Sequence, residues 1–272
     1  MTDRYAVIGN PVAHSRSPEI HAAFARECGQ NIQYERLLAS LTGFVDTADA
    51  FRMSGASGAN VTLPFKTEAF NFATARTARA ERGKSVNTLR FDRDQIVGDN
   101  TDGVGLCRDI VANLGQSLSG ARILLIGAGG AARGVVGALL DCRPASLAIT
   151  NRTHAKAQAI VDEIGAANLF CAIPSEALLT RQFDVLINAT SASIAGALPP
   201  VPMSCFGKDA LAYDMMYGKV PTPFLALAAS AGARTADGLG MLVEQAAEAF
   251  YFWRGVRPST GPVIEKMKLA TS

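Results

Sequence analysis

The 272-residue sequence has little of what disulfide frameworks and metal sites require. It contains only five cysteines and three histidines, and none of them forms a CxxC motif or another metal-ligand spacing. An odd number of scattered cysteines argues against a set of structural disulfides, and we expect no metal. Free thiols are typical of the reducing cytoplasm, where we expect the protein to act. The cysteines are Cys28, Cys107, Cys142, Cys171 and Cys205.

The chain also lacks the features of membrane proteins and nucleic-acid-binding proteins. Its formal net charge is only +2, and no run of Lys or Arg forms a basic stripe. No segment approaches the roughly 18 uninterrupted apolar residues of a membrane span. The start, MTDRYAVIGN, has neither the basic residues nor the long apolar stretch of a signal peptide. We therefore expect a soluble, unprocessed protein whose partner is a small molecule rather than nucleic acid or a membrane, and a homodimer stays open.

Motifs of covalent hydrolases are missing as well. There is no nucleophile elbow and no Ser-His-Asp order, and we interpret His21 as a helix-packing residue. What the chain does contain is α/β patterning, with a hydrophobic content of 49% that suffices for two domains. The expected strands are 5–8, 33–38, 59–63, 86–91, 95–97, 123–126, 147–150, 184–188 and 210–214.

Helices are expected between these strands. Ser17 followed by Pro18 predicts a helix start with Ser17 as the N-cap and proline at the first helical position. Further helices are expected near 41–53, from Pro64, and from Thr101 through Leu114. After Gly238 the sequence GLGMLVEQAAEAFYFW predicts a long apolar helix that returns to pack on the first domain.

A strand that runs directly into glycines is the most informative segment. In RILLIGAGGAAR, the apolar run Ile123 to Ile126 is typical of a parallel strand buried on both faces. Gly127, Gly129 and Gly130 lack the Cβ atoms that would keep a pyrophosphate away from the backbone, and the following helix N-terminus offers free N–H groups. The segment predicts a dinucleotide site, the alternative being a tight turn with no ligand.

The end of the next strand indicates which dinucleotide. Asn151, Arg152 and Thr153 follow the strand 147–150, where an Asp or Glu would bind a free ribose 2′-hydroxyl. No acid is present, and an arginine with small polar neighbours suits a 2′-phosphate. Lys156, one helical turn later, adds a second positive charge. We therefore predict NADP rather than NAD, the alternative being that both cations are ordinary surface charges.

Four polar clusters follow predicted strands, at the ends where α/β sheets bind ligands. They are residues 10–18, 60–66, 99–103 and 188–191. Lys66 falls at a helix start, where the helix dipole disfavours a cation. This position favours a role in binding or proton transfer over that of an ordinary surface lysine. Of Asp99 and Asp102, one is expected to be structural but not both. Tyr217 ends a further strand segment, where it either reaches a ligand or packs.

Taken together, these segments resemble the shikimate dehydrogenase family over nearly the whole chain. The motifs NPVAHSRSP, NVTLPFK, VNT, GDNTDG, GAGGAAR, NRT, NATS, DMMY and DGLGMLVEQ occur in the family's order. The resemblance implies an N-terminal α/β substrate-binding domain (1–102 and 239–272), a Rossmann-type NADP-binding domain (103–238), and an active site in the cleft between them. It departs from the family pattern at Lys84-Ser85, usually Gly-Ala, and at Ser193, often glycine.

The resemblance also implies roles for individual residues. Ser15 and Ser17 would bind the substrate carboxylate, and Lys66 and Asp102 would be the catalytic acid–base pair. The remaining substrate-binding residues would be Thr62, Asn87, Gln245 and Tyr217, together with Lys66 and Asp102 themselves. The cofactor-binding residues would be Gly127, Ala128, Gly129, Gly130, Ala131, Asn151, Arg152, Thr153, Lys156, Thr190, Met215 and Gly238.

The implied activity is that of an oxidoreductase of aromatic amino acid (chorismate) biosynthesis. It would reduce 3-dehydroshikimate to shikimate reversibly, with a hydride from NADPH and a proton from the Lys66–Asp102 pair. Two alternatives are a quinate/shikimate dehydrogenase of broader specificity and an NADPH-binding sensor without catalysis. Arg152 speaks against a preference for NAD, and the presence of both Lys66 and Asp102 speaks against the sensor.

Overall fold

The computed structural model describes residues 2–165, 169–190 and 196–271. The chain divides into two compact units, Met1–Gly105 with Val243–Glu265 (unit 1) and Leu106–Leu242 with Lys266–Ser272 (unit 2). These boundaries lie a few residues after the expected ones because helices α5 (Asp102–Arg108) and α9 (Leu239–Arg254) each run across one. The last residues, from Lys266, group with unit 2 instead of unit 1.

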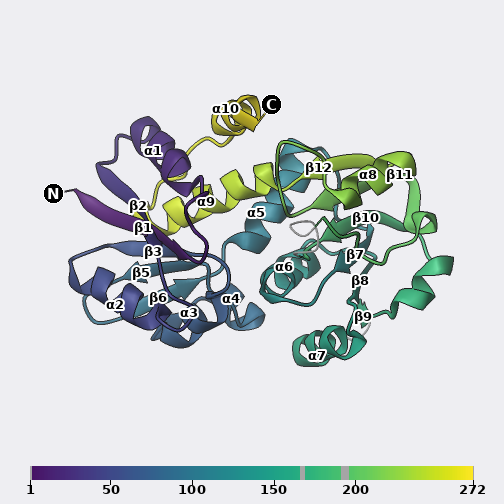
Figure 1. The fold of residues 1–272 in the computed structure, drawn as a ribbon, viewed down its shortest axis with the longest axis horizontal. Helices are drawn as coiled ribbons and strands as arrows, with labels where there is room; N and C mark the ends of the chain where they lie inside the picture. Colours follow the sequence, from purple (N-terminus) through teal and green to yellow (C-terminus); the bar gives the residue numbers. More distant parts are fainter. Residues whose placement is uncertain (1, 166–168, 191–195, 272) are drawn as a thin grey trace. The chain divides into compact units, whose positions relative to one another are not determined.

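Unit 1 is a six-stranded sheet covered by helices on both faces (Figure 1). The sheet order is β2-β1-β3-β5-β6-β4, and only β5 runs antiparallel to its neighbours. Its elements are β1 (Asp3–Gly9), α1 (Ser17–Glu27), β2 (Ile32–Leu38), α2 (Phe44–Met53), β3 (Gly58–Val61), α3 (Lys66–Phe72), β4 (Ala75–Arg76), α4 (Ala78–Gly83), β5 (Thr88–Phe91) and β6 (Ile96–Asp99).

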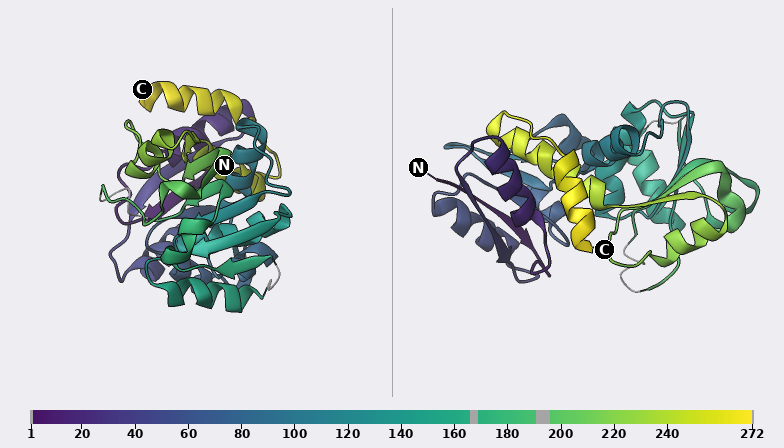
Figure 2. Two further views of the ribbon diagram at one scale, coloured as in Figure 1. Left: turned by 90° about the vertical axis from the view of Figure 1, so that its right-hand side faces the viewer. Right: turned by 90° about the horizontal axis from the view of Figure 1, so that it is seen from above.

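Side-chain alternation along β1 explains how this sheet holds two layers of helices. Ile8 points into an apolar cluster with residues of α2, α3 and α4. Tyr5 lies on the other face, where its ring stacks on Trp253 of α9 at 4.5 Å between centroids. On that face Phe24 of α1 also meets Phe250 of α9, and Figure 2 shows α1 and α9 together over the sheet. The C-terminal apolar helix thus returns to the first domain, as expected.

Unit 2 is a parallel six-stranded sheet of order β12-β11-β10-β7-β8-β9. The order reverses direction at β7, the arrangement in which dinucleotide-binding folds place their ligand. Its elements are η1 (Asp109–Asn113), β7 (Arg122–Ile126), α6 (Gly130–Asp141), β8 (Ser146–Thr150), α7 (His154–Ile164), β9 (Phe170–Ala172), η2 (Ser175–Thr180), β10 (Phe183–Asn188), η4 (Met203–Cys205), β11 (Phe206–Asp214), α8 (Pro223–Ser230) and β12 (Arg234–Asp237), and α10 (Gly261–Thr271) follows α9.

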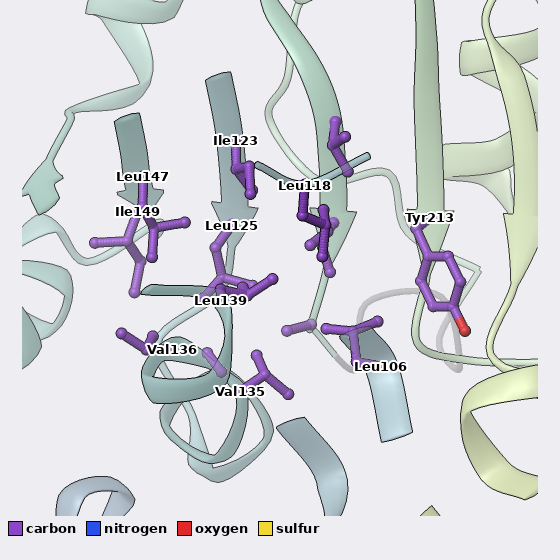
Figure 3. Close-up of a cluster of buried hydrophobic side chains, with 14 of the residues drawn as sticks. Leu106, Leu118, Ile123, Leu125, Val135, Val136, Leu139, Leu147, Ile149 and Tyr213 are labelled. Atoms are coloured by element: carbon purple, nitrogen blue, oxygen red, sulfur yellow. The ribbon is translucent and has the colours of Figure 1, made fainter. Parts of the chain in front are cut away.

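The core of unit 2 confirms that β7 is buried on both faces. Ile123 and Leu125 pack with Val135 and Leu139 of α6 in one apolar cluster (Figure 3). Leu124 and Ile126 belong to a second cluster on the opposite face, with residues of α8. A continuous apolar run is what such a strand requires, because neither face meets water.

The nine expected strands are all present, with ends shifted by a few residues. The short edge strands β4, β9 and β12 carry no clear alternation and went unpredicted. The prediction that Ser17 caps α1 was wrong, since Arg16 is the N-cap residue and no side chain caps this helix. The helix expected from Pro64 begins at Lys66, because Thr62 to Phe65 form a turn in which Phe65 N–H donates to Thr62 O at 3.1 Å.

Candidate active site

The polar clusters of unit 1 meet at one edge of its sheet. Strands β1, β3 and β6 are parallel, so their carboxyl ends lie at the same edge. Because β5 runs antiparallel, its first residues start from that edge too. The polar residues that follow these strands therefore converge at this edge, although they are distant in sequence. They are the segments 10–18, 62–66 and 100–102 and the residue Asn87.

Lys66 and Asp102 form an ion pair at this edge. Lys66 Nζ lies 2.6 Å from Asp102 Oδ2, and the two side chains are only 15% and 7% exposed. Each is the first residue of its helix, α3 and α5. The positive end of a helix favours the Asp102 carboxylate and disfavours the Lys66 ammonium, which Asp102 compensates. An ammonium group and a carboxylate are thus in direct contact, and both are largely shielded from solvent.

The Asp102 carboxylate is oriented by its neighbours. Asn87 Nδ2 donates to Asp102 Oδ1 at 2.8 Å, and Asp102 N–H donates to Asn100 Oδ1 at 3.1 Å. The Asn87 amide has one sensible orientation, because its Oδ1 accepts from Thr101 N–H at 2.9 Å. The other carboxylate oxygen, Oδ2, is thereby left to face Lys66. Gln245 of α9 joins the group, its Oε1 lying 3.3 Å from Asn87 Nδ2.

Asn100 and Thr101 are site residues to which the sequence assigned no role. Asn100 Nδ2 donates to Ser85 O at 2.9 Å, which fixes the side chain that receives the Asp102 N–H. Asn87 Nδ2 lies 3.0 Å from Thr101 Oγ1. Both residues are 2% exposed or less. Their position beside Asp102 was the only available signal, since burial of a polar loop cannot be seen in a single sequence.

Ser15 and Ser17 lie together after β1. Their Oγ atoms are 3.2 Å apart, and Ser17 N–H donates to Ser15 Oγ at 3.3 Å. Arg36 fixes the backbone of this segment by donating to Ser15 O at 2.9 Å. Thr62 follows the adjacent strand β3, where a Cβ on Gly9 would lie only 2.4 Å from Thr62 Cγ2. Glycine at position 9 therefore lets the two loops approach.

Asp99 is the structural member of the two acids. It is fully buried and accepts from Arg79 Nε at 2.7 Å, from Arg79 Nη2, and from Thr77 Oγ1 at 2.6 Å. Asn100 N–H also donates to Asp99 Oδ1, at 2.8 Å. Arg79 reaches further, to Glu248 on α9 at 2.8 Å. This partly buried network fixes the start of the segment that carries Asp102 and connects it to the helix that carries Gln245.

His21 of helix α1 is a packing residue, as expected. It is fully buried and stacks on the Tyr34 ring at 4.4 Å between centroids. Burial lowers the pKa of His21 to about 3, so the ring is neutral at physiological pH. Tyr34 OH donates to Asn60 Oδ1 at 2.7 Å. Asn60 lies inside β3 and not in the loop that follows it, so the second polar cluster begins within the sheet.

Lys84 and Ser85, where the chain departs from the family pattern, lie between α4 and β5. Lys84 ends helix α4 with φ +43, in the left-handed region that glycine adopts most easily. Ser85 is 1% exposed, and its Oγ has no hydrogen-bond partner among the described residues. The backbone at Lys84 thus has the left-handed conformation that glycine favours, although lysine adopts it less easily. The buried position 85, which would suit the methyl group of alanine, holds a hydroxyl without a hydrogen-bond partner among the described residues. Ser193, the other departure, lies outside the described residues, as does Ser191.

In unit 2, the glycine turn connects β7 to α6 as predicted. Gly127 has φ +112, and a Cβ there would lie 3.0 Å from Thr190 Cγ2 and 3.2 Å from the Ala189 backbone. A Cβ on Gly129 or Gly130 would meet nothing within 4 Å. Gly127 is therefore needed for the turn itself, whereas the other two leave open space before the N-terminus of α6. Ala128 and Ala131 pack their methyl groups on the core behind the turn.

The segment after β8 presents two positive charges. Arg152, Thr153 and Lys156 are exposed, and Asn151 Nδ2 donates to Thr153 O at 3.0 Å. Lys156 lies in the first turn of α7, and neither it nor Arg152 makes a side-chain hydrogen bond or ion pair within the described part of the chain. Unpaired cations beside a glycine-turn strand suit an anionic ligand group.

The remaining predicted residues follow β10, β11 and β12. Thr190 Oγ1 donates to Asn188 Oδ1 at 2.7 Å, and Met215 N–H donates to Asn188 O at 2.9 Å. A Cβ on Gly238 would lie 2.2 Å from Met215 O, so only glycine fits there. Tyr217 is half-buried three residues beyond β11 and belongs to unit 2, whereas the other predicted substrate residues belong to unit 1.

No three His, Cys, Asp or Glu side chains gather as metal ligands among residues 2–165, 169–190 and 196–271. Within the same residues, no helix is both long and apolar enough to cross a membrane.

Comparison with known proteins gave concordant matches. Residues 7–89 match the model of the shikimate dehydrogenase substrate binding domain, residues 109–195 that of shikimate / quinate 5-dehydrogenase, and residues 238–268 that of the shikimate 5'-dehydrogenase C-terminal domain. The chain is 55% identical to shikimate dehydrogenase (NADP(+)) from Nitrosospira multiformis over 98% of both chains. The protein of that name from Cupriavidus necator is 51% identical, over 99% of this chain and 94% of its own.

Solved structures are similar over the same length. An Ael1 enzyme from Pseudomonas putida is 48% identical with a TM-score of 0.93, over 97% of this chain and 98% of its own. Shikimate 5-dehydrogenase from Thermus thermophilus, solved in complex with NADP(H) and shikimate, is 32% identical with a TM-score of 0.88, over 99% and 100% of the two chains.

Proposed function

This chain belongs to the shikimate dehydrogenase family, and from that premise we propose that its Lys66–Asp102 pair carries the chemistry of an NADP-dependent shikimate dehydrogenase. The protein reduces 3-dehydroshikimate to shikimate reversibly, in aromatic amino acid biosynthesis. The observation that carries the assignment is the 2.6 Å ion pair, nearly closed to solvent, at the edge of the sheet where polar loops converge. A sensor without catalysis would have no need of such a pair.

The substrate carboxylate is assigned to Ser15 and Ser17. Two hydroxyls 3.2 Å apart can each donate to one carboxylate oxygen, and the Ser17 side chain is nearly buried. The ring hydroxyls are assigned to Thr62, Asn87, Asp102 and Gln245, whose polar atoms belong to the same edge, and Tyr217 is assigned a closing contact. Asn87 already links Asp102 to Gln245, so the acceptors are oriented before a substrate arrives.

The proton step follows from the pair's geometry. As the carbonyl carbon is reduced, negative charge develops on its oxygen, and an ammonium at that position stabilises it and then transfers a proton. Lys66 is the donor in this direction, and in the reverse direction its amine accepts the hydroxyl proton. Asp102 orients Lys66 through Oδ2 while Asn87 holds Oδ1, so the carboxylate cannot rotate away from the lysine.

NADPH supplies the hydride when it is bound. The residues of unit 2 fit it: the positions at Gly129 and Gly130 leave open space before a helix N-terminus, which suits a pyrophosphate. We assign the 2′-phosphate to Arg152 and Lys156, with Asn151 and Thr153 beside them. Ala128 and Ala131 complete the turn, and Thr190, Met215 and Gly238 are assigned to the rest of the cofactor.

The five free cysteines support a reducing cytoplasmic location.

The first test is an initial-rate measurement on the purified protein, with shikimate or quinate as substrate and NADP or NAD as acceptor at matched concentrations. Turnover confined to shikimate with NADP is expected. Comparable rates with quinate or NAD would instead favour the broad-specificity enzyme. NADPH binding without turnover of any pair would refute the assignment and leave the sensor.

The second test addresses Lys66 itself. Lys66→Ala should lower kcat about 10²- to 10⁴-fold, the usual worth of a positioned general acid, while NADPH binding measured by fluorescence stays unchanged. Lys208→Ala is the matched control, because Lys208 is exposed in unit 2. Unchanged turnover in Lys66→Ala would remove Lys66 from the mechanism.

A further inference from the structure

A series of side-chain hydrogen bonds runs through the sheet of unit 1 to the ion pair. Tyr34 OH of β2 donates to Asn60 Oδ1 of β3 at 2.7 Å, and Asn60 Nδ2 donates to Thr88 Oγ1 of β5 at 3.0 Å. Thr88 Oγ1 donates in turn to Asn87 Oδ1 at 2.9 Å, and Asn87 Nδ2 donates to Asp102 Oδ1 at 2.8 Å. From Asn60 onwards, each of these residues is 6% exposed or less.

All the donors in this series point towards Asp102. At that end, the ion-paired carboxylate of Asp102 accepts. At the other end, burial raises the pKa of Tyr34, so its hydroxyl stays protonated and donates. The two amides between these ends each have one orientation that satisfies both neighbours, because a reversed amide would place two donors or two acceptors against each other. The direction of the whole series is therefore fixed.

Thr88 is the residue that connects the Asn87 amide to the sheet. Backbone hydrogen bonds to β3 and β6 hold the main chain of Asn87, so only side-chain contacts set the direction of its amide. One donor to Asn87 Oδ1 is Thr101 N–H, at 2.9 Å, but Thr101 belongs to the same segment as Asp102 and moves with it. The Thr88 hydroxyl lies in β5 and accepts one hydrogen bond while it donates another. A methyl group in its place could do neither.

We propose that Thr88 is a positioning residue for the Lys66–Asp102 pair. Its hydroxyl holds the Asn87 amide in the orientation that directs Asp102 Oδ2 at Lys66. Thr88 is fully buried, so it acts through Asn87 and not on a substrate. The proposal rests on the proposed function, because it takes the ion pair as the group that transfers the proton. Without the hydroxyl, the Asn87 amide and the Asp102 carboxylate can turn together, and proton transfer depends on their alignment.

The substitution Thr88→Val replaces the hydroxyl with a methyl group of similar shape. It should lower kcat for shikimate oxidation about five- to tenfold, the usual worth of one neutral buried hydrogen bond. The Kd for NADPH, whose assigned residues belong to unit 2, should stay unchanged. The conservative variant Thr88→Ser keeps the hydroxyl and loses a buried methyl group. It should therefore be less stable in urea than the wild type and still keep its kcat.

A matched control is Thr74→Val in the same unit. The Thr74 hydroxyl also accepts one hydrogen bond, from Ile96 N–H at 2.8 Å, and donates another, to Ile96 O at 3.3 Å. It belongs to a different part of the sheet, beside β4, so kcat should not change. If Thr88→Val does not fold, the variants Thr88→Ser and Thr88→Ala differ by the same hydroxyl, and kcat should fall only in the second.

The kinetic comparison separates positioning from a structural role. A structural role would lower the folded fraction, measured by circular dichroism, and would leave kcat per folded molecule unchanged. Wild-type kcat per folded molecule in Thr88→Val would overturn the proposal. Equal losses of kcat in Thr88→Ser and Thr88→Val would overturn it as well, because the methyl group and not the hydroxyl would then matter.

A measurement without turnover keeps this test separate from that of the proposed function. In ¹⁵N-labelled protein, the side-chain amide signal of Asn87 is identified by its loss in Asn87→Asp. Its hydrogen exchange should be about five- to tenfold faster in Thr88→Val than in the wild type, and Thr88→Ser should resemble the wild type. Unchanged exchange in Thr88→Val would overturn the proposal even in an active enzyme. The expected exchange in a protein that turns over no substrate would support the positioning of the amide and refute the proposed function alone.

Discussion

Replacing Arg79 with methionine should destabilise unit 1 strongly, because it removes the counter-ion of a buried carboxylate. Asp99 is fully buried, and Arg79 meets it through two nitrogens. Methionine keeps much of the side-chain volume and none of the charge. The donors that remain for Asp99, the Thr77 hydroxyl and the Asn100 N–H, are neutral.

The magnitude follows from the cost of breaking a buried ion pair and from the exposure of Arg79. Breaking a buried ion pair by removing one partner costs about 3–5 kcal/mol. Because the Arg79 side chain is 34% exposed, water already screens part of the attraction, which places the loss at the lower end of this range. We therefore expect a loss of about 3 kcal/mol at pH 7.

Urea unfolding, followed by the fluorescence of Trp253 in unit 1, measures the loss. Arg93→Met is the control, because Arg93 is exposed and should change the free energy of unfolding by less than about 0.5 kcal/mol. A loss below about 1 kcal/mol at pH 7 would refute the reasoning.

Three further changes have expected outcomes. Ser85→Ala should raise the free energy of unfolding by about 1 kcal/mol in urea titrations, because it removes a buried hydroxyl that has no partner among the described residues. The folded-state pKa of His21, about 3, lies below its ordinary value, so the unfolded chain binds a proton that the folded chain does not. The free energy of unfolding should therefore fall as the pH drops from about 6.5 towards 3, and the loss should be about 2 kcal/mol at pH 5. The substitution His21→Phe keeps a ring against Tyr34 and should flatten that pH dependence. Arg152→Ala should raise KM for NADP about tenfold or more and leave KM for NAD nearly unchanged, in steady-state rates.

Each of these has a matched control in the same chain. Ser119→Ala removes an exposed hydroxyl and should be neutral, His154→Ala removes an exposed imidazole and should leave the pH slope in place, and Arg181→Ala removes an exposed guanidinium. A stability loss in Ser85→Ala, an unchanged pH slope in His21→Phe, or equal effects of Arg152→Ala on both cofactors would contradict the corresponding argument.

Much of the fold could be predicted from local sequence. The apolar run Ile123–Ile126 before three glycines predicts a buried parallel strand and a ligand turn, because few other structures satisfy both patterns. The edge strand Ala75–Arg76 was missed, since two residues carry no periodicity. Ser17 was misplaced by one position at the start of α1, because a serine before proline fits either the N-cap or the first turn.

The sequence alone also determined which reactive groups are available. It contains a lysine at a helix start, two acids after a strand, and an arginine where a dinucleotide fold most often has an acid. Only the tertiary structure decided the partners. It paired Asp102 with Lys66 and Asp99 with Arg79, although both acids stand in the same short segment. It also brought Gln245 to Asn87. The physical reason is that local propensity depends on neighbours along the chain, whereas hydrogen bonds and ion pairs depend on strand order and helix packing, which bring distant residues together.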